Sequence, residues 1–185
     1  MKKKRNQRPP RKMKPVYLVF CEGETEEAYI NLLRQKCRWL PLKVISRITG
    51  QAISPSIINK YIKAEQIGPN DPITTFLMYD LDTENIMEKL NQCKGSIILT
   101  SNPAVELWFL LHNTEQNASI STDSCIDKLK NVSSDWSQYK KGTLSEKQKQ
   151  ILWDNRKIAI TRSKCLREGG NPSSLIYRLI ERLKH

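Results

Sequence analysis

Short apolar segments alternate with amphipathic segments through the first 113 residues of the chain. Four segments have the length and pattern of buried or half-buried strands, and they span residues 15–21, 42–48, 73–79 and 96–100. Apolar residues at helical spacing follow each strand and predict helices over 24–38, 54–67, 84–93 and 103–112. Strands that alternate with helices indicate an α/β fold, with a parallel sheet covered by helices on both faces.

The second part of the chain has a different pattern. Residues 114–124 are polar and are expected to form a loop, and helical patterns follow over 125–132, 145–166 and 173–184. Asn171-Pro172-Ser173 has the residue types that open a helix, as has Ser101-Asn102-Pro103 earlier in the chain. We therefore predict one domain, with an α/β core over 15–113 and a helical extension over 114–185 that packs on the core.

The charge of the chain is concentrated at its beginning. The 185 residues have a formal net charge of +12. Residues 1–14 contain eight Lys and Arg and no acid, so they account for most of this excess. We interpret this segment as a disordered basic tail. Such a tail can bind the phosphates of a nucleic acid, or it can be a solvated terminus that only aids solubility.

Composition excludes several classes of protein. The five cysteines include no pair within four residues and no Cys/His cluster, which argues against a disulfide framework and a zinc site. No apolar stretch is long enough to span a membrane, and no GxxxxGK[S/T] motif is present, so an ATPase partner would be a separate chain. We expect a cytoplasmic protein that does not bind a membrane or an organic cofactor.

Acidic residues follow three of the predicted strands. Glu22 comes after the first strand and Asp80 and Asp82 come after the third, while Glu106 lies in the helix after the fourth. The carboxyl ends of parallel strands meet at one edge of a sheet, where ligand sites form. Clustered carboxylates repel each other unless a cation lies between them, and hard oxygen ligands suit Mg²⁺ or Mn²⁺. One or two such ions can promote phosphodiester cleavage, with Glu22 as a further ligand or as the general base.

Each candidate residue also has a structural interpretation. Acids such as Glu24, Glu26 and Glu27 favour the first turn of a helix, and Asp80, Asp82 and Glu106 have the residue types of turns and helix starts. We expect Trp108-Phe109-Leu110-Leu111 and His112 to lie in the core. The basic residues Lys140, Lys141, Arg162 and Lys164 either contact phosphate or are solvated surface charges.

Six blocks, in this order, resemble the RloB family: CEGETEEAY (21–29), YDLD (79–82), SNPAVELWFLLH (101–112), YKKG (139–142), AITRSK (159–164) and NPSSLIYRLIERL (171–183). The resemblance extends over about residues 15–184. One departure is Val105, where the family usually has an aromatic residue; we expect this to affect packing more than chemistry.

The resemblance implies a Toprim-like fold related to nucleases of the OLD type. Toprim domains carry a Glu after the first strand and a DxD after the third, which match Glu22, Asp80 and Asp82. It implies that these three bind Mg²⁺ or Mn²⁺ and, with Lys141, carry the catalysis. The resemblance also implies Glu106 as a further metal ligand. The implied phosphate contacts are Lys140, Lys141, Arg162 and Lys164. The implied supporting residues around the site are Gly23, Glu26, Ser101 and Asn102.

The function expected from the resemblance is a metal-dependent nuclease that cleaves DNA or RNA in antiviral defence, through abortive infection or in association with restriction. Its partners would be nucleic acid and restriction-modification or ATPase defence subunits. The alternative is a non-catalytic nucleic-acid-binding or regulatory subunit of such a complex. A primase-like enzyme is a third hypothesis, which the small size of the chain disfavours.

Overall fold

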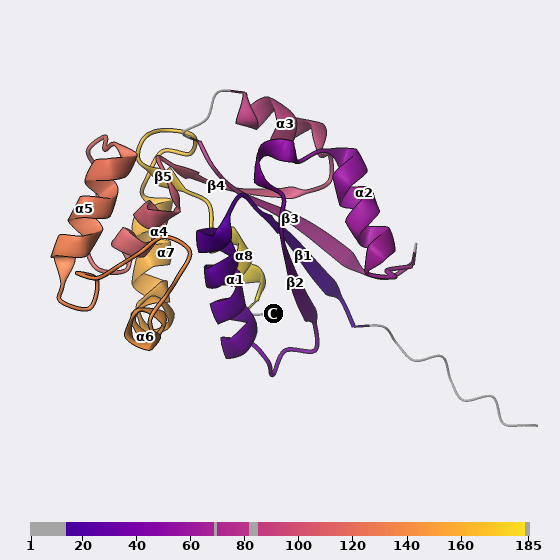
Figure 1. The fold of residues 1–185 in the computed structure, drawn as a ribbon, viewed down its shortest axis with the longest axis horizontal. Helices are drawn as coiled ribbons and strands as arrows, with labels where there is room; N and C mark the ends of the chain where they lie inside the picture. Colours follow the sequence, from indigo (N-terminus) through magenta and orange to yellow (C-terminus); the bar gives the residue numbers. More distant parts are fainter. Residues whose placement is uncertain (1–13, 69, 82–84, 184–185) are drawn as a thin grey trace, which may run out of the picture.

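The computed structural model describes residues 14–68, 70–81 and 85–183. A five-stranded sheet lies at its centre (Figure 1). The strand order is β2-β1-β3-β4-β5; the first four strands run parallel, and β5 is a short antiparallel strand at the edge beside β4. The strands are β1 (Val16–Cys21), β2 (Lys43–Ile48), β3 (Ile73–Asp80), β4 (Ile97–Asn102) and β5 (Ser173–Ser174).

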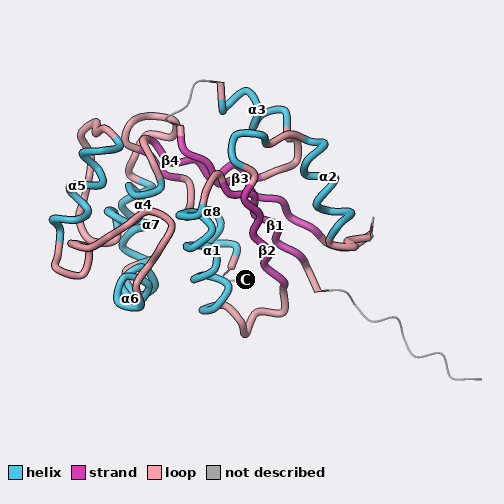
Figure 2. Tube along the Cα trace, in the orientation of Figure 1, coloured by secondary structure: helices cyan, strands magenta, loops and turns pink. Residues whose placement is uncertain are grey.

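Helices cover both faces of this sheet (Figure 2). On one face, α2 and α3 pack on Leu18 and Phe20 of β1. On the other face, α1, α4 and the helices after residue 113 share one apolar core with Val19 and Cys21. The helices are α1 (Glu24–Lys36), α2 (Pro55–Ala64), α3 (Ile86–Gln92), α4 (Val105–Leu111), α5 (Thr122–Val132), α6 (Glu146–Asp154), α7 (Arg156–Lys164) and α8 (Tyr177–Arg182), with a 3₁₀ turn η1 (Gly50–Ala52).

The α/β fold class predicted from the sequence is confirmed. Successive side chains of β1 point to opposite faces of the sheet, and Leu18, Val19, Phe20 and Cys21 all have no exposed surface. A strand buried on both faces has no polar positions to alternate with, which explains its continuous apolar run. None of the helices described is long and apolar enough to cross a membrane.

The helix after β4 begins later than the sequence predicts. Pro103 was expected at the first helical position, but α4 starts at Val105, with Ala104 as the residue that precedes it. The reason is that β4 continues through Asn102, because Ser101 and Asn102 pair with Ser174 and Ser173 of β5. The chain therefore turns at Pro103 before the helix can begin.

The C-terminal helices also differ from the prediction. The single helix expected over 145–166 is divided into α6 and α7 at Asn155, whose side chain donates a hydrogen bond to the carbonyl of His112 (3.0 Å). The helix expected from residue 173 begins only at Tyr177. Ser173 and Ser174 form β5 instead, because their backbone completes the hydrogen bonding of the outer edge of β4.

Candidate functional site

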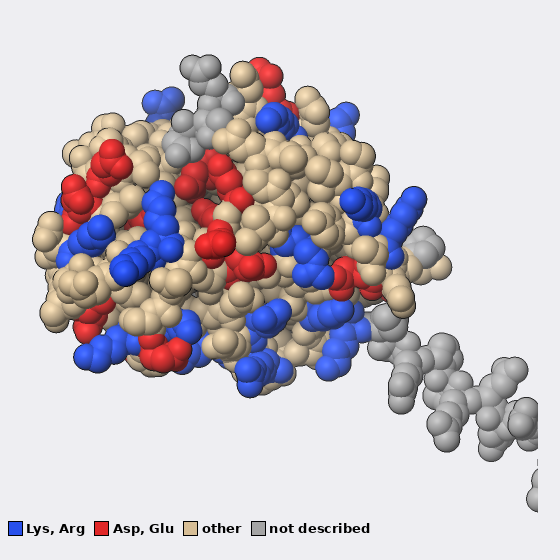
Figure 3. Space-filling view, in the orientation of Figure 1, with Lys and Arg blue, Asp and Glu red and all other residues tan. Residues whose placement is uncertain are grey.

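A hollow of about 330 Å³ lies at the carboxyl ends of the parallel strands. Glu22 reaches it from the end of β1, Asp80 from the end of β3, and Glu106 from the first turn of α4. Acidic side chains gather on this part of the surface, over the upper end of α1 in the view of Figure 3. The remaining lining residues are Gly23, Glu24, Thr25, Glu26, Val105, Lys141 and Gly142.

The backbone of the sheet holds Glu22 beside Asp80. The amide of Glu22 donates a hydrogen bond to the carbonyl of Met78 (3.1 Å), which continues the pairing of β1 with β3 by one residue. The Glu22 carboxylate in turn accepts a hydrogen bond at Oε2 from the backbone amide of Asp80 (3.1 Å). The two acids are thereby fixed as neighbours, as the shared edge of the strands predicts.

Glu26 begins α1 and also lines the hollow. Its Oε2 accepts a hydrogen bond from the backbone amide of Gly23 (3.0 Å), so it satisfies a donor at the start of the helix. The side chain is buried, and burial raises the pKa of its carboxyl group; the hydrogen bonds oppose this shift, while the charges of Glu106 and Glu22 add to it. Glu26 is therefore both an acid in the first turn of a helix and a residue of the candidate site.

Glu106 is the most deeply buried acid of the site. Only 1% of the residue is exposed, so it is not a solvated acid at the start of a helix. Its Oε1 accepts a hydrogen bond from the hydroxyl of Tyr139 (2.9 Å) and lies 4.0 Å from the ammonium group of Lys141. Its Oε2 is buried with no hydrogen-bond partner among the described residues. Burial and the Glu106 charge raise the pKa of Tyr139, which keeps its hydroxyl protonated as a donor.

The segment that carries Tyr139 and Lys141 is tied to α1 across a long stretch of sequence. The backbone amide of Gly142 donates a hydrogen bond to Oγ1 of Thr25 (2.9 Å). This contact brings the ammonium group of Lys141 to the rim of the hollow. Thr25 and the hydrogen bond of Tyr139 were not predicted from the sequence. Thr25 lies in the CEGETEEAY block and Tyr139 in the YKKG block, and neither block indicated a role for them.

Gly142→Ala is expected to lower the free energy of unfolding. Gly142 has φ of +80°, where an alanine costs about 1–2 kcal/mol, and its Cβ would lie 2.7 Å from Oε2 and 3.2 Å from Cβ of Glu24, of which the Cβ is the less able to move away. Gly169→Ala is the matched control, because Gly169 has φ of +72° with no atom near the added Cβ. Urea unfolding should show a loss in both variants, and the larger loss in Gly142→Ala; a smaller loss there would contradict this account of the segment.

Three basic residues predicted to contact phosphate do not line this hollow. The guanidinium group of Arg162 donates a hydrogen bond to the carbonyl of Leu111 (2.7 Å) and borders a separate hollow. The ammonium group of Lys164 pairs with Glu181 (2.6 Å), and Lys140 is exposed outside the lining. Contact of these residues with a nucleic acid stays a prediction.

The predicted supporting residues divide into two groups. Gly23 and Glu26 line the hollow. Ser101 instead contacts Ser174, with 3.1 Å between their Oγ atoms, and Asn102 is the last residue of β4.

His112 is buried as predicted, with Nδ1 2.7 Å from the carbonyl of Trp108, and burial lowers its pKa to about 4.

The donor atoms of the hollow suit a hard divalent cation. They are carboxylate oxygens, and the buried Oε2 of Glu106 has an unused lone-pair direction. Within 14–68, 70–81 and 85–183, no three Asp, Glu, His or Cys side chains are grouped as metal ligands. Asp82, the third predicted ligand, lies outside the described residues. Because Mg²⁺ usually keeps several waters and binds one or two carboxylates, the described acids fit part of its coordination shell.

Comparisons with known proteins connect the chain to one family. Searches of curated proteins and of solved structures find no match. The family model described as RloB-like protein matches residues 17–183, from the second residue of β1 to the residue after α8. This range contains every residue that lines the acidic hollow and all six of the sequence blocks that resemble the family. The chain therefore belongs to the RloB-like protein family.

Proposed function

We propose that this protein is a divalent-metal-dependent nuclease that hydrolyses phosphodiester bonds in DNA or RNA, in antiviral defence. The observation that carries the proposal is the convergence of Glu22, Asp80 and Glu106, from three separate elements, on one hollow beside Lys141. The Glu after β1 and the acid at the end of β3 stand where the Toprim resemblance requires its metal ligands.

Electrostatics favours a cation at this place. Five acids, Glu22, Glu24, Glu26, Asp80 and Glu106, line the hollow with the single cation of Lys141 among the lining residues that are described. Burial raises the pKa of Glu26, and the nearby charges of Glu106 and Glu22 raise it further, in the direction expected when acids repel one another. A phosphodiester would be repelled as well, so binding a polyanion here requires a neutralising ion.

The side chains divide the chemical work. A bound Mg²⁺ or Mn²⁺ supplies the positive charge that polarises the phosphodiester and lowers the pKa of the attacking water. Glu22, Asp80 and Asp82 would hold the ion, with Glu106 as a further ligand; Asp82 lies outside the described residues. Lys141, whose side chain is 58% exposed, reaches from the rim toward a non-bridging oxygen of the phosphate and stabilises the charge that develops there.

One observation favours the alternative of a non-catalytic nucleic-acid-binding or regulatory subunit. The described acids do not form a three-ligand group, and Lys141 already offers Glu106 a positive charge at 4.0 Å. In that case the carboxylates would shape the surface without binding an ion that acts in catalysis.

Cleavage assays on the purified chain test the proposal. Plasmid, single-stranded DNA, total RNA and tRNA would each be incubated with Mg²⁺, Mn²⁺ or EDTA. We expect metal-dependent cutting of at least one substrate, and a loss of about 100-fold or more in Asp80→Asn, since a metal ligand loses its charge. Asp127→Asn is the matched control, because it makes the same chemical change at an exposed position of α5.

The outcomes separate the two functions. Cutting that survives Asp80→Asn, or that EDTA does not stop, contradicts the proposal. A folded protein that binds nucleic acid and cuts none of the substrates supports the regulatory subunit. Repeating the assay with restriction-modification or ATPase subunits encoded nearby distinguishes that subunit from a nuclease that a partner activates.

A further inference from the structure

A second surface lies at the opposite end of α1 from the acidic hollow. Arg34 and Lys36 are in the last turn of α1, and Arg38 and Trp39 follow in the connection to β2. Trp39 is 71% exposed, an unusual degree for an indole. Figure 3 shows Lys and Arg side chains below the acidic cluster, toward this end of α1. We call Arg34, Lys36, Arg38 and Trp39 the basic-indole surface.

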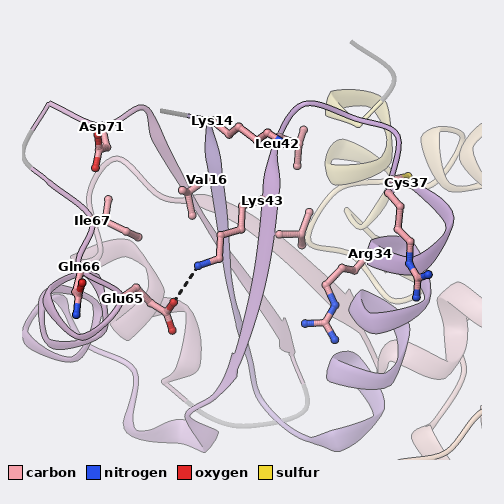
Figure 4. Close-up of a pocket in the computed structure, with 12 residues that line it drawn as sticks. Lys14, Val16, Arg34, Cys37, Leu42, Lys43, Glu65, Gln66, Ile67 and Asp71 are labelled. Carbon is pink, nitrogen blue, oxygen red and sulfur yellow. Dashed lines mark hydrogen bonds and ion pairs between the residues drawn. The ribbon is translucent and has the colours of Figure 1, made fainter. Parts of the chain in front are cut away.

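Three hollows meet at this surface. The largest, of about 590 Å³, has Lys14, Arg34, Arg38 and Lys43 around aliphatic residues such as Leu42 and Ile67 (Figure 4). A second, of about 260 Å³, is bordered by Lys36, Arg38 and Lys149. A third, of about 150 Å³, lies between Trp39 and Trp153, and the guanidinium group of Arg156 stacks on the Trp153 ring at 4.0 Å.

The positive charge of the surface is only partly neutralised. Glu65 pairs with Lys43 (3.4 Å) and with Arg47, and Glu146 pairs with Lys149 (2.7 Å). No ion pair joins Arg34, Lys36 or Arg38 to an acid in the part of the chain that the structure describes. Lys14 lies at the edge of the largest hollow, and the segment 1–13 that precedes it in the sequence contains seven more basic residues.

We infer that the basic-indole surface binds single-stranded nucleic acid. The cations pair with phosphates, and a base stacks on Trp39. Positive side chains beside an exposed aromatic ring are the combination that binds unpaired strands, because an unpaired base can place its face on the ring. A duplex keeps its base faces covered, so it would use the cations and gain nothing from the indole. An acidic peptide would likewise not require the stacking ring.

The position of the surface suggests how a strand reaches the acidic hollow, a step that rests on the proposed function. Helix α1 has 13 residues, and a helix of that length is about 20 Å long. At the 3.4 Å spacing of one strand in a DNA duplex, that distance is about six nucleotides, and an extended single strand covers it with fewer. A strand held at the C-terminal end of α1 can therefore extend along the helix to the hollow at its N-terminal end.

Binding measurements test the inference without requiring cleavage. Fluorescence anisotropy would follow a labelled 20-nucleotide oligo(dT) and a duplex of equal length in the Asp80→Asn background, with EDTA, between 50 and 200 mM salt. The triple variant Arg34→Ala/Lys36→Ala/Arg38→Ala should bind oligo(dT) about tenfold or more weakly. The slope of the logarithm of its binding constant against the logarithm of the salt concentration should be smaller in magnitude by about 2. Trp39→Ala should also lose about tenfold on oligo(dT), with an unchanged slope and little effect on the duplex.

A control with equal charge loss separates a local surface from general electrostatics. Lys60→Ala/Lys63→Ala/Lys94→Ala removes three exposed cations on the side of α2 and α3 and should change affinity less than twofold. Equal losses from both triples, or an unaffected Trp39→Ala, would overturn the inference, and circular dichroism would verify folding. If these binding predictions fail, cleavage by the wild type still tests the proposed nuclease. If the protein binds the oligonucleotide as expected but does not cut, the inferred binding surface stands and the nuclease does not.

Discussion

Glu106→Gln is expected to abolish metal-dependent cleavage while it stabilises the metal-free protein. Glutamine has the size of glutamate and can still accept the hydrogen bond of Tyr139, so the packing around position 106 is retained. What disappears is a buried negative charge: Oε2 has no hydrogen-bond partner among the described residues, and Oε1 lies 4.0 Å from the ammonium group of the exposed Lys141. Removal of such a charge relieves the desolvation cost of burying it.

Thermal unfolding in EDTA measures the stability effect. We expect a gain of about 1 kcal/mol, which corresponds to a rise in Tm of about 2–4 °C for a chain of this size. Wild-type protein should gain further stability from added Mg²⁺ or Mn²⁺, because an ion that binds only the folded state stabilises it. Glu106→Gln should lose most of that gain and cut substrate at least about 100-fold more slowly.

The matched control is Glu168→Gln, a change at an exposed acid that pairs with Arg178 (2.7 Å). It should alter Tm and cleavage little, because a surface ion pair contributes about 0–1 kcal/mol. A lower Tm in Glu106→Gln would mean that the carboxylate stabilises the fold through Tyr139 and Lys141. Unchanged cleavage would remove Glu106 from the proposed site.

The site geometry that could be predicted comes from the sheet. Parallel strands end at one edge, so the acid after β1 and the acid at the end of β3 had to lie close together, and the hydrogen bond between Asp80 and Glu22 has this origin. The strands themselves were predictable because an apolar run of strand length has few other interpretations. Local pattern was therefore sufficient to predict β1, β3 and the positions of Glu22 and Asp80 at their ends.

The parts that could not be predicted depend on contacts between distant residues. Tyr139 and Glu106 are 33 positions apart, and Thr25 and Gly142 are 117 apart, so no local pattern joins them. Ser173 and Ser174 have the residue types of a helix start, and only the open edge of β4 makes them a strand. Arg162 similarly looks like a solvated or phosphate-binding cation, yet its partner is the carbonyl of Leu111.

Phe109→Ala is expected to cause the largest loss of stability among the variants considered. Phe109 has no exposed surface and lies between Tyr29, Trp136 and Tyr139, with ring centroids 5.8, 5.9 and 6.2 Å away. Replacing a buried phenylalanine by alanine costs about 3–5 kcal/mol, because apolar contacts are lost and a cavity remains. That is a large part of the 5–15 kcal/mol that typically stabilises a domain.

Urea unfolding would show this loss as a lower midpoint at an unchanged slope. Ile158→Ala is the control, since that side chain is 49% exposed and should change stability by less than about 0.5 kcal/mol. Phe109→Leu fills more of the space and should lose less than Phe109→Ala. Because Tyr139 packs edge-on against Phe109 and holds Glu106, the same cavity should loosen that hydrogen bond and slow cleavage. A loss below about 1 kcal/mol in Phe109→Ala would show that the other three rings maintain the core without it.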